Sequence, residues 1–511
     1  MGWTEGYASD VEYVAGYYGE QGPDLLTFAC LMNGIEPIDT SAPFNYCELG
    51  FGRGLTVSLL AAANPHARFY ATDFNPAHVA GAQRLADRAG LANLTLLENS
   101  FEELAAGAVP DLPQFDFVTL HGIYTWVNAE VQQQILRFLN RYVKPGGIVY
   151  VSYNSMPGWA SMAPLQRLLY EHAQLQVRKA DQNVQSGVDF AVSLAQHKRG
   201  FFANNPALEA RLQAVQKASP NYLVHEYMHP HWQPVYHMDL ARQLAEAKLE
   251  YAGRAELALN YYRLFLPDTA VEQIDAVADS AFRETLKDYM SHTPFRKDVF
   301  VRGARRIGKH ALGAWLNRFA IAPLTPPEKM TTEFKTAQGK VNGRQEVYQA
   351  LFDALATGPK RLSELVGLPH FESAAAVVEA AALLADTQQA MVFQVRANPA
   401  TQTAQAFNRI LAQEARYSDE LLGGFASPLT GSALPGGMFE MLVFDGLSQG
   451  VPPEGEQLGR HVAKVLRENG RVLRQEGVPV TDPDKAAELV RAGVAPILDA
   501  HLPRWRTHGI V

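Results

Sequence analysis

The chain has 511 residues, of which 47% are hydrophobic and 19% charged, and its formal net charge is -8. This length exceeds a single compact core and predicts two to four domains, while the ordinary balance of apolar and charged residues excludes a disordered chain. The mild acidity provides no overall positive field for nucleic acid or an anionic membrane, so we expect neither as a partner.

Cysteine content and the N-terminal stretch indicate the compartment. Cys30 and Cys47 are the only cysteines, which excludes a disulfide framework and is typical of a reducing compartment. The first ten residues, MGWTEGYASD, lack the positive start and apolar core of a secretory signal. No apolar run approaches the length of a membrane span. The sequence therefore predicts a cytoplasmic protein.

The first third of the chain alternates strand and helix patterns. Five short apolar runs predict strands: 44–49, 68–73, 94–97, 115–120 and 148–153. Helical patterns separate them, and the one at 75–90 has Asn75 as its expected N-cap and Gly90 just past its end. Such alternation with short turns predicts a parallel sheet with helices on both faces, an α/β Rossmann-like fold. Ligands of these sheets bind beyond the carboxyl ends of the strands.

The first predicted strand ends in the glycine-rich turn ELGFGRG, which holds Glu48, Gly50, Gly52 and Gly54. Glycines at this place allow a tight turn and a close approach of the backbone to a ligand. The dinucleotide pattern G-x-G-x-x-G serves a pyrophosphate. The spacing E-x-G-x-G-x-G is more usual for S-adenosylmethionine, which has no phosphate. A glycine-rich turn without a ligand is the alternative interpretation.

Two further strand ends add candidate residues for a nucleoside. Asp73 ends the second strand at the spacing where an acid takes the ribose hydroxyls, and Phe74 follows it. After the third strand, Asn99, Ser100 and Phe101 could frame an adenine, with an ordinary strand-end turn as the alternative. Together with the glycine loop, these residues predict a nucleoside-cofactor site.

Two aromatic motifs carry a family resemblance: HGIYTW at 121–126 and SYNSMPGW at 152–159. They resemble signatures of class I S-adenosylmethionine-dependent methyltransferases that carry a methyltransferase regulatory domain, such as the rickettsial outer-membrane-protein lysine methyltransferases. GYYGE, LGFGRG, ATDFNPA, HEY and FRKDVFVRG are also similar to positions of that family. The resemblance implies S-adenosylmethionine as donor, added domains around the sheet, a protein lysine as acceptor, and a homodimer formed through an insertion.

Candidate acceptor residues follow the fourth and fifth strands. Tyr124, Tyr153 and Asn154 lie just beyond these strands, where a hydroxyl or an amide could hold the acceptor nitrogen, and Glu226 is a further catalytic candidate. His121 could hydrogen-bond near the cofactor or be a buried structural histidine. Trp126 and Trp159 could line an acceptor channel and stabilise a methylated ammonium, or could pack the junction between sheet and insertion.

The stretch HEYMH at 225–229 matches the zinc-peptidase signature H-E-x-x-H. Such peptidases place both histidines on one face of a helix. Pro230 disfavours helix at His229, because the residue before a proline is pushed toward extended geometry. We therefore predict no metal site. His225, Glu226 and Tyr227 are expected to line the acceptor pocket or to make structural hydrogen bonds.

The sequence predicts five segments: a methyltransferase domain (1–159 and 236–265), a helical insertion acting as a lid (160–235), the regulatory-domain remainder and linker (266–340), a winged-helix-like domain (341–396) and a C-terminal helical domain (397–511). The third helix of the winged-helix-like domain, at 372–385, has two glutamates and no basic residue, which favours docking or regulation over DNA binding. The basic cluster at 295–310 is interpreted as a solvated face.

Three functional hypotheses follow from these patterns. The leading hypothesis is a methyltransferase that modifies a protein, at lysine. The second keeps the cofactor but transfers the methyl group to a small molecule or a glycan. The third is a cofactor-dependent binding or scaffold protein without catalysis.

Overall fold

A computed structural model describes residues 15–175, 179–397, 399, 401–475 and 478–511. The N-terminal stretch 1–10, on which the absence of a secretory signal was predicted, lies outside these residues. Within the described part of the chain, no helix combines the length and apolar character needed to cross a membrane.

The main sheet has the strand order β3-β2-β1-β4-β5-β8-β7, and β6 pairs with β5. Its strands are β1 (Asn45–Leu49), β2 (Arg68–Thr72), β3 (Leu94–Leu97), β4 (Phe115–Leu120), β5 (Val143–Met156), β6 (Val235–Tyr236), β7 (Leu249–Arg254) and β8 (Phe295–Arg302). Strands β1 to β5 pair in parallel, whereas β8 is antiparallel to both β5 and β7. The predicted Rossmann-like α/β fold is confirmed, with one antiparallel strand added.

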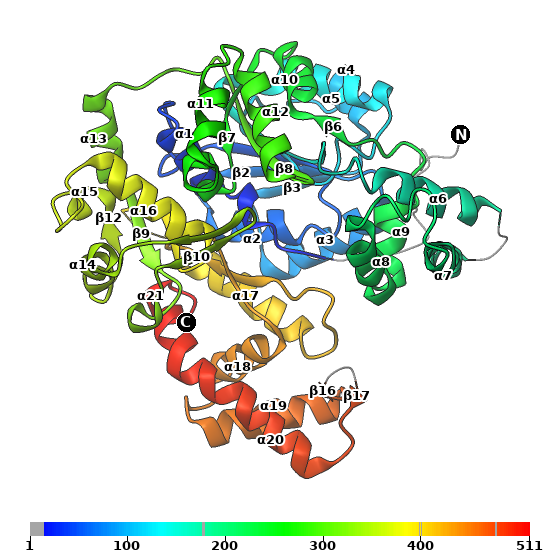
Figure 1. Ribbon diagram of the computed structural model, residues 1–511. Coiled ribbons are helices and arrows are strands. Elements are labelled where there is room, and N and C mark those ends of the chain that lie inside the picture. Colours follow the sequence, from blue (N-terminus) through cyan, green and yellow to red (C-terminus); the bar gives the residue numbers. More distant parts are fainter. Residues whose placement is uncertain (1–14, 176–178, 398, 400, 476–477) are drawn as a thin grey trace.

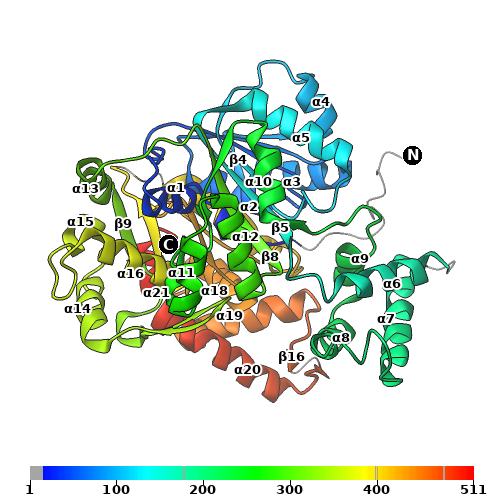
Figure 2. The ribbon, with the colours of Figure 1, turned by 45° about the horizontal axis from the view of Figure 1, so that its top comes forward.

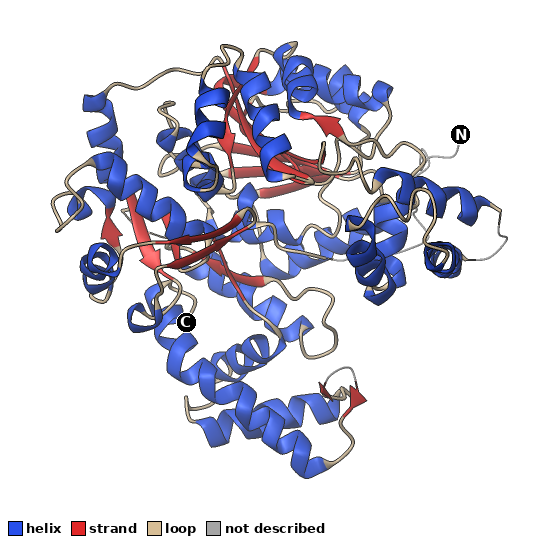
Figure 3. Cartoon of the chain, in the orientation of Figure 1, coloured by secondary structure: helices blue, strands red, loops and turns tan. Residues whose placement is uncertain are grey.

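Helices cover both faces of this sheet (Figure 3). One face packs on α1 (Pro23–Met32), α2 (Leu55–Ala63) and α3 (Pro76–Ala89), and the other on α4 (Phe101–Ala106), α5 (Ala129–Tyr142) and α10 (His237–Ala245). Alternate residues of each strand feed the two cores, so Tyr46 belongs to the first and Cys47 to the second. The caps of α3 are as predicted: Asn75 accepts a hydrogen bond from the Ala77 amide, and Gly90 is left-handed at φ 68°.

The segment after β5 forms a separate group of helices beside the sheet (Figures 1 and 2). These are α6 (Ala163–Gln174), α7 (Ala180–Gln196), α8 (Ala207–Lys217) and α9 (Pro220–Tyr227). They have a core of their own, which includes Leu169, Val188 and Leu223. The chain then returns through β6, α10 and β7, as the sequence predicted for a helical insertion.

The basic segment at 295–310 contains β8, which lies between β5 and β7 near one end of the sheet. Two helices, α11 (Asp268–Asp275) and α12 (Ser280–Ser291), precede it. Arg296 is fully buried and forms ion pairs with Asp288 and Asp298, and Lys297 pairs with Glu20. The interpretation of this cluster as a solvated face is therefore wrong for these two residues. Asp288 sits on α12 and Glu20 is distant in sequence, so the pattern of basic residues alone could not reveal that Arg296 is buried and Lys297 partly buried.

A second, small sheet has the order β12-β9-β13. It combines β9 (Phe319–Pro323), β12 (Lys360–Arg361) and β13 (Ala390–Gln394) with α13 (Lys309–Arg318), α14 (Gln345–Leu355), α15 (Leu362–Leu365) and α16 (Ala374–Asp386), beside the hairpin β10 (Glu333–Thr336) and β11 (Gly339–Asn342). Its central strand, β9, comes from before residue 341, outside the segment predicted to be winged-helix-like. That assignment stays a prediction.

The C-terminal segment is mainly helical, as predicted. It contains α17 (Thr401–Glu414), β14 (Gly424–Ser427), β15 (Ser432–Pro435), α18 (Met438–Ser448), α19 (Gly455–Glu468), β16 (Arg474–Gln475), β17 (Val478–Pro479), α20 (Pro483–Pro496) and α21 (Leu502–Thr507). Helix α17 packs on α2 and α3, and the hairpin β14–β15 packs on α2. A buried ion pair at 2.9 Å joins Arg396 to Asp24 on α1. The C-terminal segment thus packs on α2 and α3, the helices that cover one face of the main sheet.

Candidate functional site

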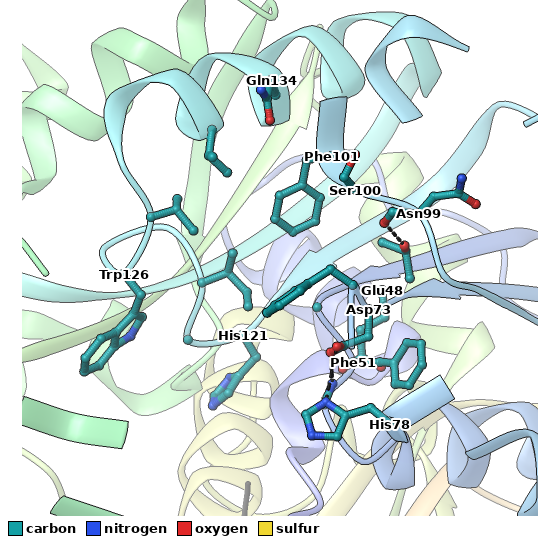
Figure 4. Close-up of a pocket in the computed structure, with 18 of the residues that line it drawn as sticks. Glu48, Phe51, Asp73, His78, Asn99, Ser100, Phe101, His121, Trp126 and Gln134 are labelled. Carbon is teal, nitrogen blue, oxygen red and sulfur yellow. Dashed lines mark hydrogen bonds and ion pairs between the residues drawn. The ribbon is translucent and has the colours of Figure 1, made fainter. Parts of the chain in front are cut away.

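A cavity lies at the carboxyl ends of β1, β2 and β4. All predicted cofactor residues except Gly54 line it: Glu48, Gly50, Gly52, Asp73, Phe74, Asn99, Ser100, Phe101 and His121. Asn99, Ser100 and Phe101 lie on one side, and His121 and Trp126 on the other (Figure 4). The sheet topology brings these residues together from four loops that are separate in sequence.

The glycine loop is shaped by close packing on both sides. Gly50 has φ 75°, and a Cβ atom there would lie 2.4 Å from Cδ1 of Ile123. Gly54 has φ 73°, and a Cβ atom there would lie 2.7 Å from Cβ of Ala82 on α3. Any larger residue would clash at either position. Gly54 therefore allows α2 to pack against α3 and does not line the cavity, which differs from its predicted role.

Asp73 holds the glycine loop in place. Its Oδ2 accepts a hydrogen bond from the Gly52 amide at 2.8 Å. Its Oδ1 accepts one from the Asn75 amide at 3.0 Å and lies 3.2 Å from Nδ1 of His78. A carboxylate offers about four acceptor positions, so this side chain can still accept from ligand hydroxyls.

Glu48 is a buried carboxyl group with an incomplete set of partners. Its side chain is 3% exposed, and Oε1 accepts a hydrogen bond from Nε2 of Gln21 at 3.2 Å. Its Oε2 has no hydrogen-bond partner among the described residues. Burial, with a smaller contribution from Asp73, raises the pKa of Glu48 to about 8. A cationic ammonium group of a ligand would complete this site and favour the ionised carboxylate.

The opposite side of the cavity offers a flat apolar surface. Ser100 caps α4 in a capping box with Glu103, and the Asn99 carbonyl accepts a hydrogen bond from the Thr72 hydroxyl at 2.6 Å. These bonds fix the start of α4, which carries Phe101. The partly buried Phe101 ring faces the cavity (Figure 4). Such a ring suits a planar heterocycle.

His121 is held as a neutral imidazole. Its ring stacks on Tyr18 with 3.9 Å between centroids, and Nδ1 lies 2.9 Å from the Tyr150 hydroxyl. Burial lowers the pKa of His121 to about 4. Tyr18 also lines the cavity, and our sequence reasoning did not propose it. The only signal was the short GYYGE stretch of the family resemblance.

The insertion supplies another wall of the cavity, through His229 and His231. His229 packs edge-on against Trp126 at 5.1 Å between centroids, and Trp232 lies 6.3 Å from Trp126. The segment that follows crosses the ends of β4 and β5, because the Gln233 amide donates to the Thr125 carbonyl at 2.9 Å and β6 pairs with β5. Burial, then the neighbouring His225 and His231, lowers the pKa of His229 to about 3.

None of the four predicted catalytic side chains lines this cavity. Strand β5 continues to Met156, so Tyr153 and Asn154 pair with β8 inside the sheet instead of lying beyond its edge. The Tyr153 hydroxyl donates to Asp298 at 2.6 Å. The Tyr124 hydroxyl donates to Oε1 of Gln243 at 2.8 Å on α10, and Glu226 lies on α9. The structure does not bring these side chains to one site.

The HEYMH stretch is split by the end of a helix. Helix α9 ends at Tyr227, so His225 is helical and His229 is not, which confirms the prediction made from Pro230. Tyr227 is buried in the insertion core and accepts a hydrogen bond from Nε of Arg211 at 2.7 Å. Among the described residues, no three His, Cys, Asp or Glu side chains are arranged to hold a metal ion. His229 and His231 line the cavity, whereas His225, Glu226 and Tyr227 do not.

Comparisons with known proteins agree with this geometry. A family model described as "Methyltransferase domain" matches residues 47–149, and one described as "Predicted methyltransferase regulatory domain" matches residues 219–302. The second range runs from α9 to β8, so the regulatory domain supplies three strands of the main sheet, β6, β7 and β8.

Similar proteins cover nearly the whole chain. The uncharacterized protein sll1526 of Synechocystis is 34% identical over 487 residues, which are 93% of each chain. The uncharacterized protein RP789 of Rickettsia prowazekii is 24% identical over 56% of this chain and 51% of its own length. The solved structure of PKMT2 from Rickettsia typhi in complex with AdoHcy has a TM-score of 0.70 at 18% identity and covers 98% of this chain and 99% of that one.

Proposed function

Because this chain belongs to the class I S-adenosylmethionine-dependent methyltransferases that carry a methyltransferase regulatory domain, we propose that its methyl acceptor is a lysine side chain of a protein. The observation that carries this proposal is the aromatic wall formed by Trp126, His229 and His231 at one side of the cavity. A long apolar side chain that ends in an amine fits such a wall.

The residues on the donor side fit S-adenosylmethionine, which supplies a methyl group on a cationic sulfonium when bound. We assign the unpartnered Oε2 of Glu48 to its ammonium group, Asp73 to the ribose hydroxyls and Phe101 to the adenine ring. The left-handed Gly50 lets the backbone approach without a side chain. These residues bind and orient the donor, and orientation supplies most of the rate enhancement in an in-line transfer.

The acceptor wall favours a neutral amine. A free lysine has a pKa of about 10.4, so its ammonium group must lose a proton before it attacks. Desolvation against an apolar wall beside a cationic donor lowers that pKa. The indole of Trp126 then stabilises the methylated ammonium through its ring face. His229 remains neutral at physiological pH, so it does not repel either cation. This proposal assigns acceptor contact to Trp126, His229 and His231 in place of the four predicted residues.

Transfer of a labelled methyl group into a cell lysate tests the acceptor class. We expect label in protein, and methylated lysine after acid hydrolysis of that protein. An Asp73→Ala variant, which loses the donor site, is the matched control and should leave the protein unlabelled. Label confined to the small-molecule or glycan fraction would support the second hypothesis, and no label in any fraction would favour a binding protein.

A further inference from the structure

The segment from Gly16 to Gln21, which we call the strap, crosses the edge of the donor cavity and contacts a different part of the molecule at almost every residue. The Tyr18 amide donates to the Thr56 hydroxyl on α2 at 3.1 Å, and that hydroxyl donates to the Gly16 carbonyl at 3.1 Å. Glu20 forms an ion pair with Lys297 on β8. Nε2 of Gln21 donates to Glu48 in the cavity. The strap therefore takes its position from both the sheet and α2.

Tyr17 ties the strap to the C-terminal hairpin β14–β15. Its hydroxyl lies 2.6 Å from Oγ of Ser432 and accepts a hydrogen bond from the Ala433 amide at 3.0 Å. Burial raises the pKa of Tyr17 to about 12, so the hydroxyl keeps its proton and can donate to Ser432. These two bonds join residues more than 400 positions apart. Strand β15 thus holds the residue immediately before Tyr18.

The hairpin is itself firmly held on both sides. Phe425 on β14 packs against Phe444 and Trp505 of the C-terminal helices, with centroids 5.2 and 5.0 Å away. On the other side, Nδ2 of Asn64 donates to the Gly431 carbonyl at 2.7 Å. At Gly423 a Cβ atom would lie 2.7 Å from Cδ2 of Leu55 on α2, so the chain leading to the hairpin packs too closely on α2 to leave room for a side chain there.

Neighbouring residues of the strap face opposite sides. Tyr18 lines the donor cavity and stacks on His121, whereas Tyr17 and Glu20 line a second cleft between the sheet and the C-terminal half. A shift of Tyr17 caused by the loss of one of its hydrogen bonds would therefore move Tyr18 in the cavity wall. The same shift would reach Gln21, the one hydrogen-bond partner of Glu48 among the described residues.

We propose that the C-terminal hairpin positions Tyr18 in the wall of the donor cavity, and that the Tyr17 hydroxyl is the connection between them. Tyr17 is a positioning residue, and Tyr18 is the residue that meets the donor. This role would explain why a C-terminal segment without cavity residues packs on α2 and on the strap. The proposal rests on the cavity being the donor site and is independent of which acceptor receives the methyl group.

Calorimetry with S-adenosylhomocysteine on the full-length protein tests this connection. We expect Tyr17→Phe to raise the Kd by about 3- to 10-fold, the equivalent of one to two hydrogen bonds. Ser432→Ala should raise it less, because the Ala433 amide still binds Tyr17, and should add little in the Tyr17→Phe background. Tyr18→Ala should exceed both. If Tyr17→Phe lowers the melting temperature but leaves the Kd unchanged, the contact is structural only and the proposal fails.

A matched control breaks another contact between the same two parts of the chain. Arg88 on α3 pairs with Glu414 on α17 without touching the strap. Glu414→Gln should leave the Kd unchanged, and an increase equal to that of Tyr17→Phe would overturn the proposal. Thermodynamic linkage also requires that binding at the donor cavity stabilise the hairpin. Saturation with S-adenosylhomocysteine should slow amide exchange in β14–β15 of the parent protein, and this protection should shrink in Tyr17→Phe.

Discussion

Two buried carboxyl groups of the main sheet, Glu48 on β1 and Asp298 on β8, have opposite surroundings. Asp298 is fully buried and accepts from the Tyr153 hydroxyl and from Nε of Arg296, and Nδ1 of His237 lies 2.8 Å from it. Burial alone would raise its pKa, but the Arg296 guanidinium and His237 hold it well below the usual range. Among the described residues, only the side-chain amide of Gln21 donates to Glu48, and burial raises the pKa of Glu48 to about 8.

The difference separates a structural acid from one that we propose to bind the donor. Asp298 has its charge balanced within the fold, so it joins β8 and the helices before it to the sheet. No cation among the described residues pairs with Glu48, and a buried acid in that state is stable only when neutral or when a ligand brings the positive charge. Substitutions at the two carboxyl groups and at their partners test this contrast.

The largest effect should come from removing Arg296, the cation that balances Asp288 and Asp298 in the buried cluster. Arg296→Leu leaves Asp288 and Asp298 buried without their partner, and we expect the free energy of unfolding to fall by about 3–5 kcal/mol. Denaturant unfolding measures this change. Arg305→Ala is the control, because Arg305 pairs with Glu36 on the surface and should change stability by less than about 1 kcal/mol. If both variants lowered the free energy of unfolding equally, Arg296 would not be the residue that balances the charge of the buried cluster.

Removing the unbalanced acid, Glu48, should weaken binding of the ligand rather than destabilise the fold. We expect Glu48→Gln to raise the Kd for S-adenosylmethionine by about 10- to 100-fold, because a charge-assisted hydrogen bond is lost. Because the pKa of Glu48 is raised to about 8 in the folded protein, its contribution to stability is lost as pH rises through about 8 and the buried carboxyl group ionises. Without cofactor, Glu48→Gln should therefore be more stable than the parent protein at pH 9. Calorimetry and thermal unfolding measure the two effects. An unchanged Kd would show that Glu48 does not face the ammonium group.

The same carboxyl group predicts a pH dependence of donor binding. Below pH 8 the free protein holds Glu48 protonated, and a cationic donor favours the ionised form. At pH 7 binding should therefore release a proton, and affinity should rise about fivefold between pH 7 and pH 8 as the ionised fraction of Glu48 grows. Calorimetry in buffers of different ionisation enthalpy counts the proton. In Glu48→Gln both the proton release and the slope should disappear, and their persistence would assign them to another group.

The smallest effect is expected from removing a single hydrogen bond in the cluster around Asp298. Tyr153→Phe removes one of several hydrogen bonds to Asp298, so we expect about 1 kcal/mol less stability and unchanged turnover. Denaturant unfolding and initial rates measure the two quantities. Loss of turnover with full stability would return Tyr153 to the acceptor site that its sequence position indicated.

The residues that the sequence predicted for the donor lie together around one cavity, because their signals are local. The glycine loop, Asp73 and the start of α4 each follow a strand directly, and parallel strands bring such ends to one edge. The acceptor side could not be predicted in the same way. Strand β5 ends three residues later than predicted, which makes Asn154 a strand residue, and pairing with β8 places both Tyr153 and Asn154 inside the sheet. His229 and His231 reach the cavity only because the insertion folds back over β4 and β5.

The sequence by itself determined the alternating elements, the caps of α3, the Rossmann-like sheet and the strand-end loops that line the cavity, since each depends on periodicity and turn chemistry within a few residues. Tertiary structure alone decided that the basic strand β8 is buried beside β5, that Arg296 balances Asp298, and that Tyr17 meets a hairpin more than 400 residues away. Pairings over such separations depend on which surfaces the folded chain brings together, and no local pattern in the sequence records them.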